Sequence, residues 1–246
     1  MNFLKITEDY YSQWLGTDAL SAINEIQFIY SQERNAVQYG YSKSFDIYCF
    51  YQAGKTVISY GDKAREKIHC LRDKVKAHSS LSELKAALCE VYNASPNHNV
   101  KFVFDKLQTV NGIARTLCTD NYPAYLDFFK RNNPGCKNTD WVNDYFNEMI
   151  TNKLCVGIYE DDILVSCTDA PGMPYMSDKV QEVGINTLPY YRGKGYASAA
   201  CSLCTRNIIE SGKCPQWSTE INNTASEKLA YKVGFIRYAD VLTVTI

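Results

Sequence analysis

The stretch Leu-Pro-Tyr-Tyr-Arg-Gly-Lys-Gly-Tyr-Ala at positions 188–197 constrains the fold most, because it joins a predicted strand to a predicted helix. Alternating residues at 180–188 predict a long strand before it. The helix predicted after it, over about 194–211, has small and apolar residues along one face: Ala197, Ala200, Cys201, Cys204 and Ile208. Gly193 and Gly195 allow a tight turn and a close approach of a ligand to the backbone.

A helix that begins at such a turn can bind phosphate. Its first amides have no partner inside the helix and point outward, at the positive end of the helix dipole. A glycine pair alone is a weak signal, because a tight turn with exposed basic residues has the same appearance. The turn lacks the third glycine and the later acidic residue of a dinucleotide-binding fingerprint, and no Gly-Lys-Ser/Thr follows as in a P-loop.

The elements around this turn predict an α/β layered domain. Hydrophobic periodicity and turn residues predict the order β-α-α-β-β-β-α-β-α-β, with strands at 113–118, 154–160, 163–168, 180–188, 216–221 and 241–246 and helices at 121–131, 140–150, 194–211 and 225–233. Asp161-Asp162 marks a hairpin turn. Because most connections in the sheet are hairpins, we expect a mixed, mostly antiparallel sheet flanked by helices rather than a doubly wound fold.

The N-terminal part reads as a smaller α/β region. We expect a helix over about 18–34, a hairpin of strands near 45–51 and 55–60, helices over 64–75 and 81–91, the second behind a Ser80–Glu83 capping box, and a strand at 100–105. A boundary near Asn111-Gly112 divides the chain into an N-terminal α+β region, 1–110, and a second domain, 111–246. The first region is either a degenerate half of the second fold or a separate lid, and we expect it to wall one side of an acceptor cleft.

A second motif follows the turn after one predicted strand. Residues 223–235 read Asn-Thr-Ala-Ser-Glu-Lys-Leu-Ala-Tyr-Lys-Val-Gly-Phe, a short helix with Gly234 at its end. This segment resembles the Asn…Leu-Tyr-Glu-Lys-x-Gly-Phe pattern of the GCN5-related N-acetyltransferases (GNAT). The turn resembles the Arg/Gln-x-x-Gly-x-Gly/Ala signature of the same family, with Arg192, Gly195 and Ala197 in its positions. The resemblance covers about 113–246. Within it, the stretch from Asp140-Trp141 through 169–176 to 215–217 resembles a bacterial subfamily that carries an extra N-terminal region.

This resemblance implies a GNAT fold for the C-terminal domain and an acyltransferase activity (EC 2.3.1.-). The expected reaction moves an acetyl group from acetyl-CoA to a primary amine by direct attack, without a metal. It implies a backbone amide near Thr187 or Leu188 for the thioester oxygen and Asn223 for the pantetheine. The full set expected to bind coenzyme is Ile185, Thr187, Leu188, Arg192, Gly193, Lys194, Gly195, Tyr196, Ala197, Asn223 and Ser226.

The catalytic residues are less determined. Glu182 shares a strand face with Gly184 and Asn186 and is the predicted general base, the alternative being a solvated or salt-bridged strand residue. Ala230 stands where many family members have a tyrosine that protonates the leaving thiolate, and Tyr231 lies about 100° further around the helix. Ser226 or a water could protonate the thiolate, or it could leave unassisted. The competing function is an acyl-CoA-binding sensor or interaction module with weakened catalysis.

Composition limits the partners. The formal net charge is −1, which argues against a nucleic-acid binder, and no apolar run is long enough to span a membrane. The ten cysteines and the absence of a signal-like N-terminus favour a reduced, cytoplasmic protein. Cys201 and Cys204 lie on the apolar helix stripe and are expected to pack rather than bind zinc. The acceptor is a small-molecule or peptide amine, and the chain a monomer or homodimer.

Overall fold

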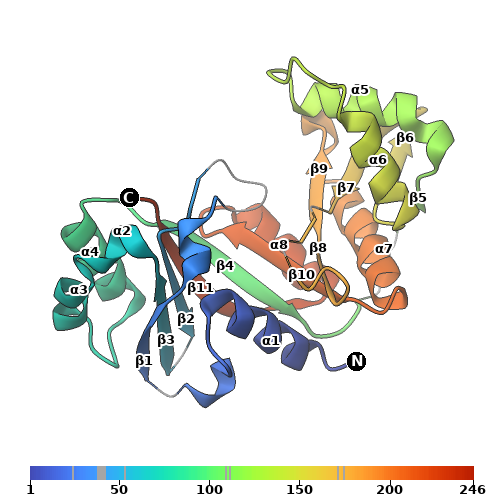
Figure 1. Ribbon diagram of the computed structural model, residues 1–246. Coiled ribbons are helices and arrows are strands. Elements are labelled where there is room, and N and C mark those ends of the chain that lie inside the picture. The colour runs from blue at the N-terminus through green and yellow to red at the C-terminus, as the bar shows by residue number, and fades with distance from the viewer. Residues whose placement is uncertain are drawn as a thin grey trace. The chain divides into compact units, whose positions relative to one another are not determined.

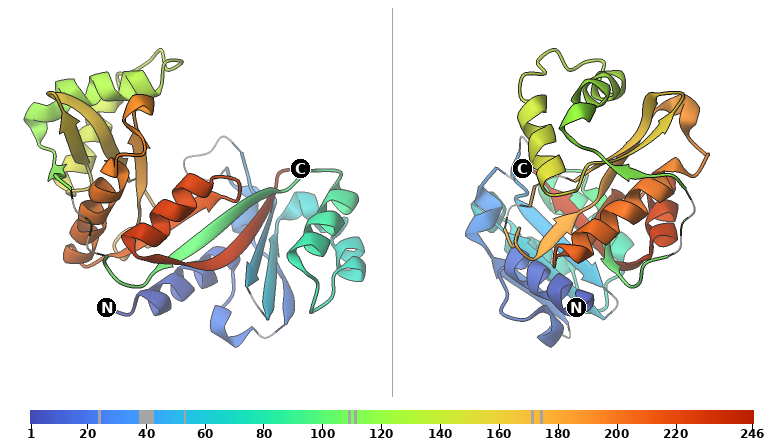
Figure 2. Two further views of the ribbon diagram at one scale, coloured as in Figure 1. Left: turned by 180° about the vertical axis from the view of Figure 1, so that it is seen from behind. Right: turned by 90° about the vertical axis from the view of Figure 1, so that its right-hand side faces the viewer.

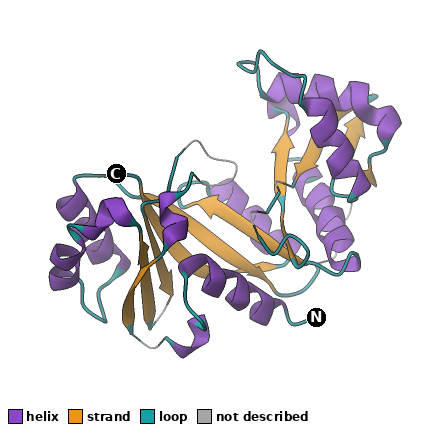
Figure 3. Ribbon diagram, viewed as in Figure 1, coloured by secondary structure: helices purple, strands orange, loops and turns teal. Residues whose placement is uncertain are grey.

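The structure is a computed structural model that describes residues 1–23, 25–37, 43–52, 54–108, 110, 112–170, 172–173 and 175–246. The chain forms two compact units that interleave along the sequence. Unit 1 contains Phe104–Trp217 and Ala225–Ile236, together with Met1. Unit 2 contains Asn2–Val103, Ser218–Thr224 and Arg237–Ile246. Each unit combines helices with strands (Figure 1, Figure 3). The division at 110/111 stays a prediction.

The helices and strands of unit 2 come mainly from the N-terminal part of the chain. They are α1 (Phe3–Leu15), β1 (Ile26–Tyr30), β2 (Ile47–Gln52), β3 (Lys55–Tyr60), α2 (Asp62–Arg65), α3 (Ile68–Lys74), α4 (Leu81–Tyr92), and most of β4 (Asn97–Phe104) and β11 (Phe235–Val244). Strand β3 pairs antiparallel with β2 and parallel with β1, and β2 pairs antiparallel with β11. The predicted hairpin and the Ser80–Glu83 capping box are confirmed.

The predicted helix over 18–34 is wrong. Those residues form short 3-10 turns at Leu20–Ala22 and Gln32–Asn35 around strand β1, whose five residues pair in register with 56–60. The β-branched and aromatic residues of β1 suit a sheet, so tertiary pairing overrides the helical spacing. The helix of this region lies earlier, in α1, where the Asn2 side chain accepts from the Lys5 amide at 3.0 Å and Gly16 ends the helix with φ 78°.

Helices cover both faces of the unit 2 sheet (Figure 2). Side chains at Ile47, Cys49 and Ile58 share one buried cluster with residues of α3 and α4 such as Leu71 and Leu88. On the other face, the ring of Tyr11 from α1 lies 5.3 Å from that of Phe50. The alternation of β2 residues between these two layers is the period-2 pattern of a strand that is buried on both sides.

Unit 1 follows the predicted element order closely. Its elements are β5 (Arg115–Thr116), α5 (Tyr122–Asn132), α6 (Val142–Thr151), β6 (Val156–Glu160), β7 (Ile163–Asp169), β8 (Val180–Glu182), β9 (Gly184–Thr187), α7 (Tyr196–Glu210), most of β10 (Cys214–Glu220) and α8 (Thr224–Val233). Asp161 and Asp162 form the predicted hairpin turn, with φ of 48° and 63°. Helices α5 and α6 cover one face of β6, β7 and β9, and α7 covers the other (Figure 2).

The strand predicted over 180–188 changes partners in its middle. Its first part, β8, pairs parallel with Cys214–Gln216 of β10, and the Val183 amide still donates to the Gln216 carbonyl at 2.9 Å. From Gly184 onward the chain is β9, which pairs antiparallel with β7. The strand orders are β1-β3-β2-β11-β4-β10-β8 and β5-β6-β7-β9. The predicted fold class, a mixed and mostly antiparallel sheet flanked by helices, is confirmed. Within the described residues no helix has the length and apolar character needed to cross a bilayer.

Candidate active site

The glycine turn follows β9 directly and leads into α7. A short 3-10 turn, Pro189–Tyr191, precedes it. Gly193 and Gly195 have φ of 80° and 86°, and a Cβ built on either would meet no atom within 4 Å. The backbone at both positions is therefore in the left-handed region that favours glycine, and the space beside it is open.

The amides of this turn are available to a ligand. Among the residues that the structure describes, none accepts a hydrogen bond from the backbone N–H groups of 193–198, whereas the next amide, Ala199, donates to the Gly195 carbonyl at 3.2 Å. No side chain caps the helix at Gly195. Unpartnered amides at the positive end of a 15-residue helix make a site for a multiply charged anion.

The backbone of β9 is the second part of the site. The Leu188 amide donates to the Val165 carbonyl at 2.9 Å, and hydrogen-bonded pairs alternate along an antiparallel ladder. Ile185 and Thr187 therefore point their N–H and C=O groups away from β7, toward the free edge of the four-stranded sheet. Arg192 contacts that edge, where its Nε donates to the Thr187 carbonyl at 3.1 Å. Of the two amides named for the thioester oxygen, that of Leu188 is engaged and that of Thr187 faces the edge.

Glu160, which sequence reasoning missed, ties together two residues of the turn. Lys194 Nζ lies 2.8 and 3.2 Å from its two carboxylate oxygens, and the Tyr196 hydroxyl donates to the same carboxylate. Hydrogen bonds from Lys194 and Tyr196 hold the pKa of Glu160 below its usual value. The bond to Glu160 in turn raises the pKa of Lys194. No local signal could reveal this cluster, because Glu160 ends a strand 34 residues before Lys194.

A Glu160→Gln variant is expected to bind coenzyme A about two- to fivefold more tightly than the wild type, with a steeper loss of affinity as salt is added. The substitution removes a negative charge beside the anion site and releases the Lys194 ammonium toward a phosphate. Calorimetric titration at two ionic strengths measures both effects. An affinity equal to or below that of the wild type would show that Glu160 positions Lys194 rather than opposing the ligand.

The predicted catalytic side chains lie near the point where the strand changes partners. Glu182 ends β8 in register with Gln216 and is half-buried. Ser226 accepts a hydrogen bond from the Trp217 indole N–H at 3.1 Å. Ala230 is fully buried, whereas Tyr231 is exposed and its hydroxyl donates to Glu227 at 3.0 Å. The tyrosine next in sequence to the usual position therefore faces outward.

Asn223 belongs to unit 2 and immediately precedes α8. Its backbone amide donates to the Glu220 carbonyl at 3.0 Å.

Cys201 and Cys204 are buried in α7, where burial raises the pKa of both thiols, to about 12 for Cys204. Across the described part of the chain, no group of three or more His, Cys, Asp or Glu side chains is arranged to hold a metal ion.

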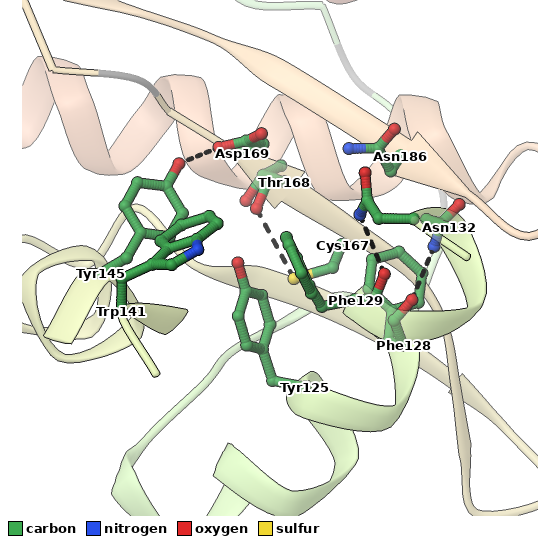
Figure 4. Close-up of a pocket in the computed structure, with 11 residues that line it drawn as sticks. Tyr125, Phe128, Phe129, Asn132, Trp141, Tyr145, Cys167, Thr168, Asp169 and Asn186 are labelled. Carbon is green, nitrogen blue, oxygen red and sulfur yellow. Dashed lines mark hydrogen bonds between the residues drawn. The ribbon is translucent and has the colours of Figure 1, made fainter. Parts of the chain in front are cut away.

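A pocket of about 280 Å³ lies on the α5–α6 side of β7 and β9 (Figure 4). The lining residues are Tyr125, Phe128, Phe129, Asn132, Asn133, Trp141, Tyr145, Cys167, Thr168, Asp169 and Asn186. Tyr125, Phe128, Phe129 and Asn132 share one face of α5, a spacing readable from sequence. The strand residues that complete the pocket could not be assigned to it without the sheet register.

Comparison with known proteins identifies the family. The model of the GNAT acetyltransferase family matches residues 49–240, well over half of the chain, so this chain belongs to that family. The match begins well before residue 113, where the motif resemblance starts. Among curated proteins, none matches the sequence.

Solved structures share the fold at low identity. A GNAT acetyltransferase from Colwellia psychrerythraea is 20% identical with a TM-score of 0.51, over 68% of this chain and 64% of that protein. A GCN5-related N-acetyltransferase from Sphaerobacter thermophilus is 16% identical with a TM-score of 0.52, over 68% of this chain and 56% of that protein. This chain therefore spans less than two thirds of the length of either. A protein from Salmonella typhimurium, solved with its cofactor acetyl-CoA, matches at 14% identity and a TM-score of 0.45, over 55% of this chain and 92% of its own.

Proposed function

We propose that this chain is an acetyl-CoA-dependent N-acetyltransferase that acetylates a primary amine of a small molecule or peptide by direct attack on the thioester. Membership of the GNAT acetyltransferase family supports an acyltransferase. The single observation that carries the coenzyme site is the run of unpartnered amides at 193–198, at the end of an edge strand in which the Ile185 and Thr187 amides face outward.

In this proposal the coenzyme diphosphate lies against the amides of the turn, with Arg192 and Lys194 beside it. Each hydrogen bond to a charged oxygen is worth roughly 1.5–3 kcal/mol, so a few of them suffice to anchor the coenzyme. The pantetheine arm runs along the free edge of β9, where Ile185 and Thr187 offer backbone groups. The Thr187 amide is the proposed donor to the thioester oxygen.

The chemistry then needs one base and one proton donor. The amine nitrogen attacks the thioester carbonyl carbon, a C–N bond forms, and the ammonium proton passes to the Glu182 carboxylate directly or through water. The C–S bond breaks and the thiolate leaves. Ser226, whose oxygen accepts a hydrogen bond from the Trp217 indole, is the proposed donor to that thiolate. A water, or departure without assistance, remains the alternative because Ala230 replaces the usual acid.

Glu182→Gln is expected to slow amine-dependent thiol release by about 100-fold or more, which is the usual contribution of a general base, with coenzyme affinity unchanged. Thiol release is followed at saturating acetyl-CoA and amine, with Glu210→Gln, an exposed residue at the end of α7, as the matched control. An unchanged rate in Glu182→Gln would remove the residue from the mechanism.

A second candidate function rests on Ala230 itself. A buried alanine at the acid position, with Tyr231 turned outward, favours an acyl-CoA-binding sensor whose catalysis is weak. Tight binding of acetyl-CoA without thiol release on any amine would favour this candidate. The chain's ten free cysteines support a reducing, cytoplasmic setting for either function.

A further inference from the structure

The pocket between α5, α6 and the β7–β9 strands is an aromatic box (Figure 4). Trp141 forms T-shaped contacts with two neighbours, at centroid distances of 5.4 Å to Phe129 and 5.8 Å to Tyr145. The Trp141 side chain is exposed at the rim, whereas Tyr125 and Phe128 are buried deeper. Aromatic rings whose planes are steeply inclined to one another present both faces and edges to a ligand in the cavity, and aromatic faces attract cations.

Asp169 adds a carboxylate to this box. It ends β7, is half-buried, and accepts a hydrogen bond from the Tyr145 hydroxyl. No Lys, Arg or His of the described residues forms an ion pair with it. Burial raises the pKa of Asp169, and the bond from Tyr145 opposes that rise. A cation entering the pocket would supply the countercharge that none of the described side chains provides.

The pocket lies next to the proposed site of acetyl transfer. Asn186 is exposed at its rim and pairs with Cys167 on its floor. The following residue, Thr187, has its amide directed toward the free edge of β9, where the coenzyme is proposed to bind. A group held in the pocket therefore lies beside the strand against which the thioester is proposed to bind.

A carboxylate and aromatic faces both favour the protonated form of an amine. The amine that attacks the thioester must be neutral, so the pocket suits a different group of the same molecule. We propose that it binds the cationic, non-reacting end of an acceptor that carries two basic groups, such as an aliphatic diamine, while the other end is acetylated. This assignment rests on the proposed function for the acetylation step and on the pocket alone for the binding step.

The test uses cadaverine, an aliphatic diamine, and 1-pentanol, an uncharged probe with the same five-carbon chain, with the full chain. Calorimetry without coenzyme should show that cadaverine binds about tenfold more tightly than 1-pentanol, the margin expected from one charged contact. Asp169→Asn should abolish that preference, and Trp141→Ala should weaken cadaverine binding about fivefold. Asp144→Asn, the same exchange at an exposed site on α6, should change nothing.

Thermal unfolding separates binding from folding. Asp169→Asn removes a desolvated charge and keeps an acceptor for Tyr145, so it should unfold at the same temperature as the wild type or higher. Equal affinities for cadaverine and 1-pentanol, or an undiminished preference in Asp169→Asn, would overturn the pocket assignment even if acetyl transfer occurs. Cadaverine binding that depends on Asp169 and Trp141, without thiol release from acetyl-CoA on any amine tested, would uphold the pocket and refute the transferase.

Discussion

A Gly195→Ala variant is expected to bind coenzyme A at least about tenfold more weakly than the wild type, which corresponds to about 1.4 kcal/mol. The added methyl would enter the open space beside the unpartnered amides, where the diphosphate is proposed to lie. The residue also has φ 86°, so a side chain strains the turn by about 1 kcal/mol and shifts the amides themselves. Calorimetric titration with coenzyme A measures the loss.

The other end of the same helix provides a matched control. Gly212 has φ 83°, and a Cβ built there also meets no atom within 4 Å. Gly212→Ala should therefore lower stability by about the same amount as Gly195→Ala, with no effect on coenzyme affinity. Equal affinities of the two variants for coenzyme A would place the phosphates somewhere other than the turn.

Gly234→Ala is expected to have the largest effect on stability, a loss of roughly 3 kcal/mol or more in the free energy of unfolding. Gly234 follows α8 with φ 117°, and an added Cβ would stand 1.9 Å from the Lys106 carbonyl oxygen. The Gly234 carbonyl accepts from the Asp105 and Lys106 amides at 3.0 and 3.3 Å, so the clash would break the contact that joins residues 105–106 to the end of α8.

Denaturant unfolding of Gly234→Ala beside Gly212→Ala separates the clash from the backbone strain. Of these two glycines, only Gly234 has a backbone carbonyl within contact distance of the added Cβ. The difference between the two variants should be about 2 kcal/mol, the usual cost of overpacking. If both variants lose the same stability, residues 105–106 are not held against α8 as described.

The turn and its flanking elements could be predicted from sequence because their signals are local. The glycines, the amphipathic stripe of α7 and the caps of α4 each lie within a few residues of the structure that they determine. Strand β9 was predicted only as part of one long strand. No local sequence feature shows that the chain stops pairing with β10 at the end of β8 and begins pairing with β7 at the start of β9. The helix predicted over 18–34 is wrong for the same reason, because β1 is a strand by virtue of its pairing with the parallel strand β3, which local sequence does not reveal.

The side chains around the site were harder to predict. Glu160 contacts Lys194, and Tyr145 contacts Asp169 24 residues away, so each pair depends on sheet register and helix placement. An exposed tryptophan or a half-buried aspartate has no sequence signature of its own. Only the α5 residues of the pocket had a readable pattern, and that pattern is shared by any helix that packs on a sheet.

The most direct test of the account is continuous measurement of free thiol from acetyl-CoA across a panel of monoamines and diamines, with no-amine controls. The account predicts thiol release that depends on the amine, accompanied by an acceptor heavier by one acetyl group. Saturating acetyl-CoA binding with no amine-dependent release on any member of the panel would contradict the proposed transferase activity.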